Sequence, residues 1–86
     1  MNIDISIFFK NDDLDEIRNT DEYTIKQEEI SQDVFFNYES DTVNNNLIKY
    51  IINILSRRYL DQSDRIEVLA AYDLYASNKK HRDSIS

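Results

Sequence analysis

Acidic side chains are the groups in this sequence that are numerous enough to carry chemistry. Seventeen Asp and Glu residues occur among 86, whereas His81 is the one histidine and stands in the polar segment beside Lys80 and Arg82. Paired carboxylates act as acid and base only at a working separation in a cleft, and no spacing here predicts such a pair. A histidine in a polar tail is not positioned as a base. We therefore predict no catalytic residues and a protein that is not an enzyme.

The same groups do not form a recognisable metal site. Asp12, Asp13, Asp15 and Glu16 are crowded like the ligands of a calcium loop, but the glycine at its sixth position and the glutamate at its twelfth are missing. The chain has no cysteine, which excludes disulfides and thiolate ligands. We predict no metal and no cofactor. Cysteine usage, the absence of a basic leader and the lack of a membrane-length apolar run together indicate a cytoplasmic protein.

Charge is divided unequally along the chain. The net charge is −7, with −9 on residues 1–41 and +2 on residues 42–86. An acidic surface repels nucleic acid and attracts basic proteins, so we predict a basic protein partner and no direct contact with nucleic acid. Membrane association is not expected either, because the polar positions of the most amphipathic segment are rich in asparagine rather than lysine.

The elements that must position these charges are clearest in the second half. Apolar residues recur at steps of three and four from Val43 to Leu60, which predicts an amphipathic helix. A second helix is expected over Arg65–Asn78, with Asp61 or Ser63 as its N-cap. The short connection makes the two helices antiparallel neighbours. The apolar arc of the second helix is wide, which favours a position sandwiched within the core.

The first half allows two interpretations. Residues 2–10 alternate apolar and polar as a strand does, and residues 11–19 fit a short helix with Asp12 as N-cap. Residues 23–30 and 33–39 alternate like a pair of strands. However, Ile30, Val34 and Tyr38 also have helical spacing, and Thr24 with Gln27 imitates a capping box.

We predict an α+β fold for a single domain, residues 1–86. Residues 1–41 form an acidic, strand-rich half with a short helix, which packs on an antiparallel helical hairpin at 42–78, and residues 79–86 form a basic, frayed tail. The alternative is an all-α bundle of four helices.

Protein recognition is the function that these features favour. Acidic clusters lie near aromatic residues, which combines long-range attraction for a basic target with side chains that anchor interfaces. The predicted partner-binding residues are Asp12, Asp13, Asp15, Glu16, Asp21, Glu22, Tyr23, Glu28, Glu29 and Tyr38.

Size, acidity and missing catalytic groups are similar to those of bacterial immunity proteins that block nuclease toxins and of phage inhibitors that mimic the charge of DNA. The likeness is one of class and carries over no individual residue. We therefore expect an inhibitor, immunity protein or antitoxin that blocks the basic groove of a nucleic-acid-processing enzyme or toxin. The alternative is a regulatory or structural adaptor that forms a homodimer through its helical hairpin.

Overall fold

The fold is built from helices. The computed structural model describes Ile5, Phe9, residues 14–34 and residues 40–85, and the side chains of all these except 34, 40–42 and 79–85. Within this part the chain forms four helices and no strand: α1 (Leu14–Arg18), α2 (Asp21–Val34), α3 (Ser40–Leu55) and α4 (Gln62–Ile85). The α+β prediction is therefore wrong, and the described part has the all-α arrangement that was the alternative.

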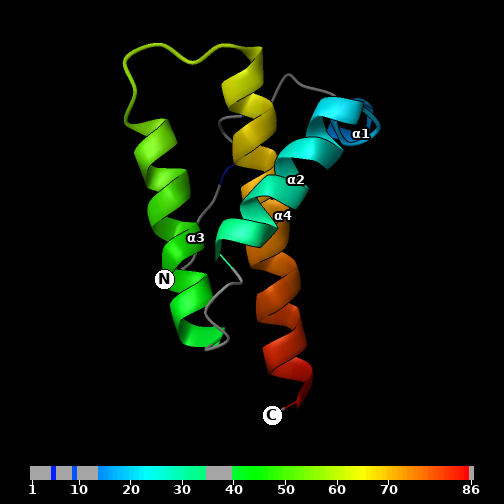
Figure 1. The fold of residues 1–86 in the computed structure, drawn as a ribbon, viewed down its shortest axis with the longest axis vertical. Helices are drawn as coiled ribbons and strands as arrows, with labels where there is room; N and C mark the ends of the chain where they lie inside the picture. Colours follow the sequence, from blue (N-terminus) through cyan, green and yellow to red (C-terminus); the bar gives the residue numbers. More distant parts are fainter. Residues whose placement is uncertain (1–4, 6–8, 10–13, 35–39, 86) are drawn as a thin grey trace.

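Helix α4 lies at the centre of this arrangement. Both α2 and α3 pack along it, whereas they contact each other little (Figure 1). Four consecutive residues of α4, Val68 to Ala71, are fully buried, which requires neighbours on most sides of the helix. The two alanines in this run allow the flanking helices to approach closely. The expectation that this helix is sandwiched in the core is confirmed.

Helices α3 and α4 form the expected antiparallel hairpin. The inner side of α3 contributes Val43, Leu47, Ile51 and Ile54 to the core, at the spacing read from the sequence. Near the far end of the hairpin, the Asn78 side chain donates a hydrogen bond of 2.6 Å to the Oδ1 atom of buried Asn44. Helix α3 ends at Leu55, five residues before the predicted end at Leu60, and α4 continues to Ile85, beyond Asn78.

The connection between these helices is held by a reciprocal cap. The N–H of Asp64 donates to Oδ1 of Asp61 at 2.8 Å, and the N–H of Asp61 donates to Oδ2 of Asp64 at 3.2 Å. This is the geometry of a capping box, which satisfies two backbone donors at the start of α4. Arg57 closes the turn through a hydrogen bond of 2.5 Å to Asp64. Asp61 is therefore the N-cap of α4, and it is one of the two positions that the sequence predicted for this cap.

The strand predicted for residues 23–30 is the main error within the described part. These residues lie in α2, where Tyr23 and Ile30 are buried at a spacing of seven, two helical turns, while Ile25 is exposed. In a strand, side chains alternate between the two faces, so Tyr23 and Ile25 would have lain on the same face. The N-cap is Thr20, whose hydroxyl accepts the N–H of Tyr23 at 3.2 Å, rather than Thr24. Residues 35–39 of the second predicted strand lie outside the described residues.

The strand predicted for residues 2–10 is tested at two positions. Ile5 and Phe9 are both buried, and the N–H of Phe9 donates to the carbonyl of Ile5 at 3.2 Å. A strand separates residues four apart by roughly 13 Å, so Ile5 and Phe9 lie closer together than two such residues of one strand. The short helix expected next is present as α1, with Ile17 buried and Leu14 packed against the core. Its predicted N-cap, Asp12, lies outside the described residues.

Candidate protein-binding surface

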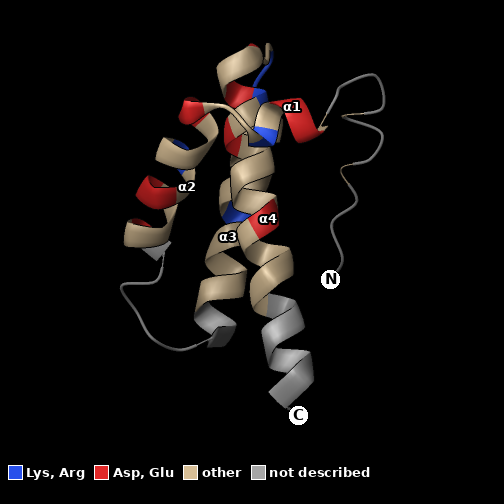
Figure 2. Cartoon of the chain, turned by 90° about the vertical axis from the view of Figure 1, so that its right-hand side faces the viewer, with Lys and Arg blue, Asp and Glu red and all other residues tan. Residues whose placement is uncertain are grey.

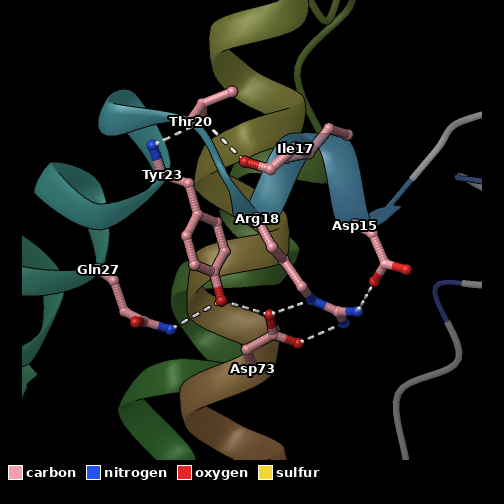
Figure 3. A network of polar contacts seen from close by, with 7 residues as sticks. All are labelled: Asp15, Ile17, Arg18, Thr20, Tyr23, Gln27 and Asp73. Atoms are coloured by element: carbon pink, nitrogen blue, oxygen red, sulfur yellow. Dashed lines mark hydrogen bonds and ion pairs between the residues drawn. The ribbon is translucent and has the colours of Figure 1, made fainter.

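A polar network joins α1 and α2 to the central helix (Figure 3). The Arg18 guanidinium donates from Nε to Oδ2 of Asp73 at 2.9 Å and from Nη2 to Oδ1 at 3.0 Å. The Tyr23 hydroxyl donates to Oδ2 of the same carboxylate at 2.5 Å, and Gln27 donates to the Tyr23 oxygen at 3.0 Å. One carboxylate of α4 thus receives donors from two helices, which sets the position of both.

The two donors of this network keep their protons at neutral pH. Burial, followed by the hydrogen bond to Asp73, raises the pKa of Tyr23 to about 12, so its hydroxyl stays neutral near pH 7. The hydrogen bond to Asp73 is also the main reason that the pKa of Arg18 is raised. Neither group can exchange a proton near neutrality. Among the described residues, moreover, no group of three His, Cys, Asp or Glu could hold a metal ion.

A second network ties α2 to the hairpin. Lys26 Nζ lies 3.6 Å from Oε2 of Glu67 on α4 and 3.8 Å from Oε2 of Glu29. Burial, together with the charge and hydrogen bonding of Glu67, raises the pKa of Tyr50 on α3 to about 12. Lys26 is the one basic residue of α2 and is directed toward α4. The outer face of α2 is consequently left with acids alone as its charged groups.

That outer face has a regular composition. Asp21, Ile25, Glu28 and Gln32 are all exposed and follow one another at steps of four, three and four, which places them in one line along the helix. Glu22 and Glu29 flank the line and are exposed as well. Ile25, 54% exposed, stands among these acids. We define the acidic α2 surface as these six residues; the acidic segments of α2 are red in Figure 2.

Some of the predicted partner-binding residues lie on the acidic α2 surface. Four of the predicted residues lie in it: Asp21, Glu22, Glu28 and Glu29. Its Glu22 accepts a hydrogen bond of 2.8 Å from Ser63, the residue that was the other candidate cap of α4. Ile25 was missed, because its exposure follows from helical periodicity, whereas the strand interpretation directs it to the same face as Tyr23.

The remaining predicted residues lie elsewhere. Tyr23 is buried in the core with its hydroxyl on Asp73, so its ring is not presented to a partner. Asp15 and Glu16 are exposed on α1, and Asp15 lies 3.9 Å from Arg18. Asp12, Asp13 and Tyr38 fall outside the described residues.

Comparison with known proteins adds no assignment. No family model, no curated protein and no solved structure matches the chain. Among the described residues, no helix is long and apolar enough to cross a membrane. The fold and the surface define a class only, that of a small acidic protein whose described part is all-α and has one predominantly acidic outer helix face.

Proposed function

We propose that this protein is a small inhibitor, of the immunity-protein or antitoxin kind, whose acidic α2 surface blocks the basic substrate groove of a nucleic-acid-processing enzyme or toxin. The observation that carries the proposal is the exposed line of α2, in which carboxylates surround an accessible isoleucine. Carboxylates at helical spacing present negative charge to a groove built for phosphates, and Ile25 supplies apolar contact at the centre.

The internal contacts of α2 support this role. The inner side of the helix is held by Tyr23 on Asp73, by Lys26 on Glu67 and by buried Ile30. Of the outer carboxylates, Glu22 accepts a hydrogen bond from Ser63 of α4, whereas no contact with α4 is recorded for Asp21, Glu28 or Glu29 among the described residues. A surface held in place from behind loses little conformational entropy on binding, which favours affinity. The proposal therefore predicts that outer-face substitutions change binding without changing the fold.

The first experiment identifies the target. The wild-type protein is immobilised and exposed to a lysate of the cell that encodes it, and bound proteins are eluted with a salt gradient. The expected result is a basic nucleic-acid-processing enzyme that elutes at moderate salt, is inhibited by the added protein and is displaced by its own nucleic-acid substrate. Capture of no such enzyme, or of one that remains fully active, would overturn the proposal.

The second experiment assigns the surface. The variant E28Q/E29Q removes two charges from the acidic α2 surface, and D33N/D61N is its matched control. Asp33 lies toward Tyr50 of α3, whose pKa its charge helps to raise, and an asparagine at position 61 still caps α4. With the captured enzyme, E28Q/E29Q should lower the association rate about tenfold at low salt, and the control should stay within about twofold of the wild type. Equal rates for both variants would exclude the acidic α2 surface as the binding surface.

A further inference from the structure

Helix α3 carries an exposed line that matches the spacing of the α2 line. Asn45, Lys49 and Ile52 of α3, and Ser56 directly after its end, are all exposed and follow one another at steps of four, three and four. Ile52 is 49% exposed, close to the value for Ile25. Each line therefore places one accessible isoleucine among polar residues, on the side of its helix that faces away from α4.

The two lines have opposite charge. Residues 43–60, which include this line and the connection after it, contain Lys49, Arg57 and Arg58 and no acid, whereas residues 21–34 contain five acids and Lys26. Arg57 is paired with Asp64, and Arg58 lies with its guanidinium carbon 5.5 Å from the ring centroid of exposed Tyr59. Helix α3 itself contains Asp41 as well as Lys49, so the positive charge of its exposed line is that of Lys49 alone, against Asp21 and Glu28 in the α2 line.

The order of residues makes the two lines complementary when they run antiparallel. Ile25 is second in its line and Ile52 is third in the other, so reversal of one helix brings the isoleucines opposite each other. The same register places Glu28 opposite Lys49 and Gln32 opposite Asn45, and it directs Asp21 toward the end of α3 that precedes Arg57. The steps of four and three are those of helix pairs that pack along a seam.

We propose that α2 of one copy of this protein docks antiparallel on α3 of a second copy, with Ile25 against Ile52 and Glu28 paired with Lys49. Within one chain the two lines are not in contact, because each residue named in this register is exposed. The contact joins different surfaces of the two copies, so it is heterologous, and the assembly retains an unfilled α2 line at one end and an unfilled α3 line at the other.

This association does not depend on the proposed inhibitor function, since it needs only the purified chain. It uses the same α2 line, however, so a copy whose α2 is covered by a neighbour cannot present it to a target. The sequence alone suggested self-association through the exposed part of the helical hairpin, and the outer face of α3 is one such exposed part. The proposed contact joins this face of α3 to α2 of the next copy rather than to a second hairpin.

The test is sedimentation equilibrium of the full chain over a range of concentrations at about 0.15 M salt, where charges farther apart than about 8 Å are largely screened. The wild type should associate reversibly. E28K and K49E should each raise the dissociation constant at least tenfold, because each places like charges opposite each other, and E28K/K49E should restore it to within about threefold. The control D33K changes the net charge by the same amount as E28K at a position roughly 140° around α2 from Glu28, and it should leave association unchanged.

A mixture tests the register directly. Equimolar E28K and K49E should associate to within about threefold of the wild type, although each variant alone associates weakly. The lysine introduced by E28K meets the glutamate introduced by K49E, and the unchanged Glu28 of the K49E copy meets the unchanged Lys49 of the E28K copy, so both contacts between unlike copies join opposite charges.

Far-UV circular dichroism checks that every variant keeps the helical content of the wild type. A wild type that remains monomeric throughout, a double variant or a mixture that is not restored, or a D33K variant as weak as E28K would each overturn the proposal.

Discussion

The hydroxyl of Tyr23 donates a hydrogen bond of 2.5 Å to Oδ2 of Asp73, a residue fifty positions further along the chain. The same carboxylate accepts two hydrogen bonds from Arg18, so Asp73 holds the end of α1 and the start of α2 against α4. This relationship turns α2 so that its acidic line faces outward. The structural network and the candidate binding surface are therefore two sides of one helix.

Replacement of Asp73 by alanine should destabilise the fold. Removal of the carboxylate leaves the partly buried Tyr23 hydroxyl and the Arg18 guanidinium without their shared acceptor, and hydrogen bonds to charged groups contribute about 1.5–3 kcal/mol each. Because Arg18 is partly exposed, we expect a loss of about 2 kcal/mol in the free energy of unfolding, measured by urea denaturation. The matched control is E28A, which removes an exposed carboxylate. A loss no greater than that of E28A would contradict the role of Asp73.

Stability should fall at alkaline pH. The pKa values of Tyr23 and Tyr50 are raised to about 12 in the folded protein, mainly by burial, whereas unfolded tyrosine ionises near pH 10. Between these values the unfolded state loses its protons first. The contribution of both tyrosines to the free energy of unfolding is therefore complete below about pH 10 and decreases as pH rises toward about 12.

Urea denaturation at a series of pH values measures this decrease, and tyrosinate absorbance shows which groups ionise late. The variants Y23F and Y50F should each remove one late-ionising group and make the alkaline loss of stability smaller. If the absorbance titration of Y23F has the same late component as that of the wild type, the burial of the Tyr23 hydroxyl is wrongly assigned.

The cap of α4 should contribute measurably to stability. The variant D61A removes the oxygen that accepts the N–H of Asp64, and loss of an N-cap costs about 1 kcal/mol. The neighbouring exposed residue offers the control Q62A, which should change the free energy of unfolding by no more than about 0.5 kcal/mol. The variant D61N should retain most of the wild-type stability, since asparagine also caps helices. Equal stabilities for D61A and D61N would argue against this cap.

Two isoleucines of α2 distinguish a helix from a strand in solution. Ile30 is 2% exposed and Ile25 is 54% exposed, so I30A should cost about 2–5 kcal/mol and I25A no more than about 0.5 kcal/mol. A strand over residues 23–30 would place these side chains on opposite faces and bury Ile25 together with Tyr23. Thermal or urea unfolding of the two variants measures the difference. A larger loss for I25A than for I30A would restore the strand interpretation.

The sequence predicts the hairpin well because several local signals agree there. The apolar residues of α3 recur over several turns, and Asp61 precedes α4 at a capping position with Asp64 three residues later. Such patterns specify a helix and its start without reference to the rest of the fold. The uneven charge and the absence of cysteine are likewise read directly from composition.

The sequence does not predict α2 or its surface correctly, because few apolar residues define its period. Tyr23, Ile25 and Ile30 satisfy a strand as readily as a helix, and the choice depends on which of them the rest of the protein buries. The polar residues that decide it are distant in sequence: Asp73 accepts the Tyr23 hydroxyl, and Glu67 attracts Lys26.

The sequence by itself thus determined the α3–α4 hairpin, the two candidate caps of α4 and the acidity of the first half, because each depends on neighbouring residues. Only the tertiary structure decided that α4 is central, that Tyr23 belongs to the core and that Ile25 is accessible among acids. The physical reason is that burial is a property of packing. A helix presents to solvent whichever side its partners leave uncovered, and for α2 the residues that cover its inner side lie on α4, some forty to fifty positions away.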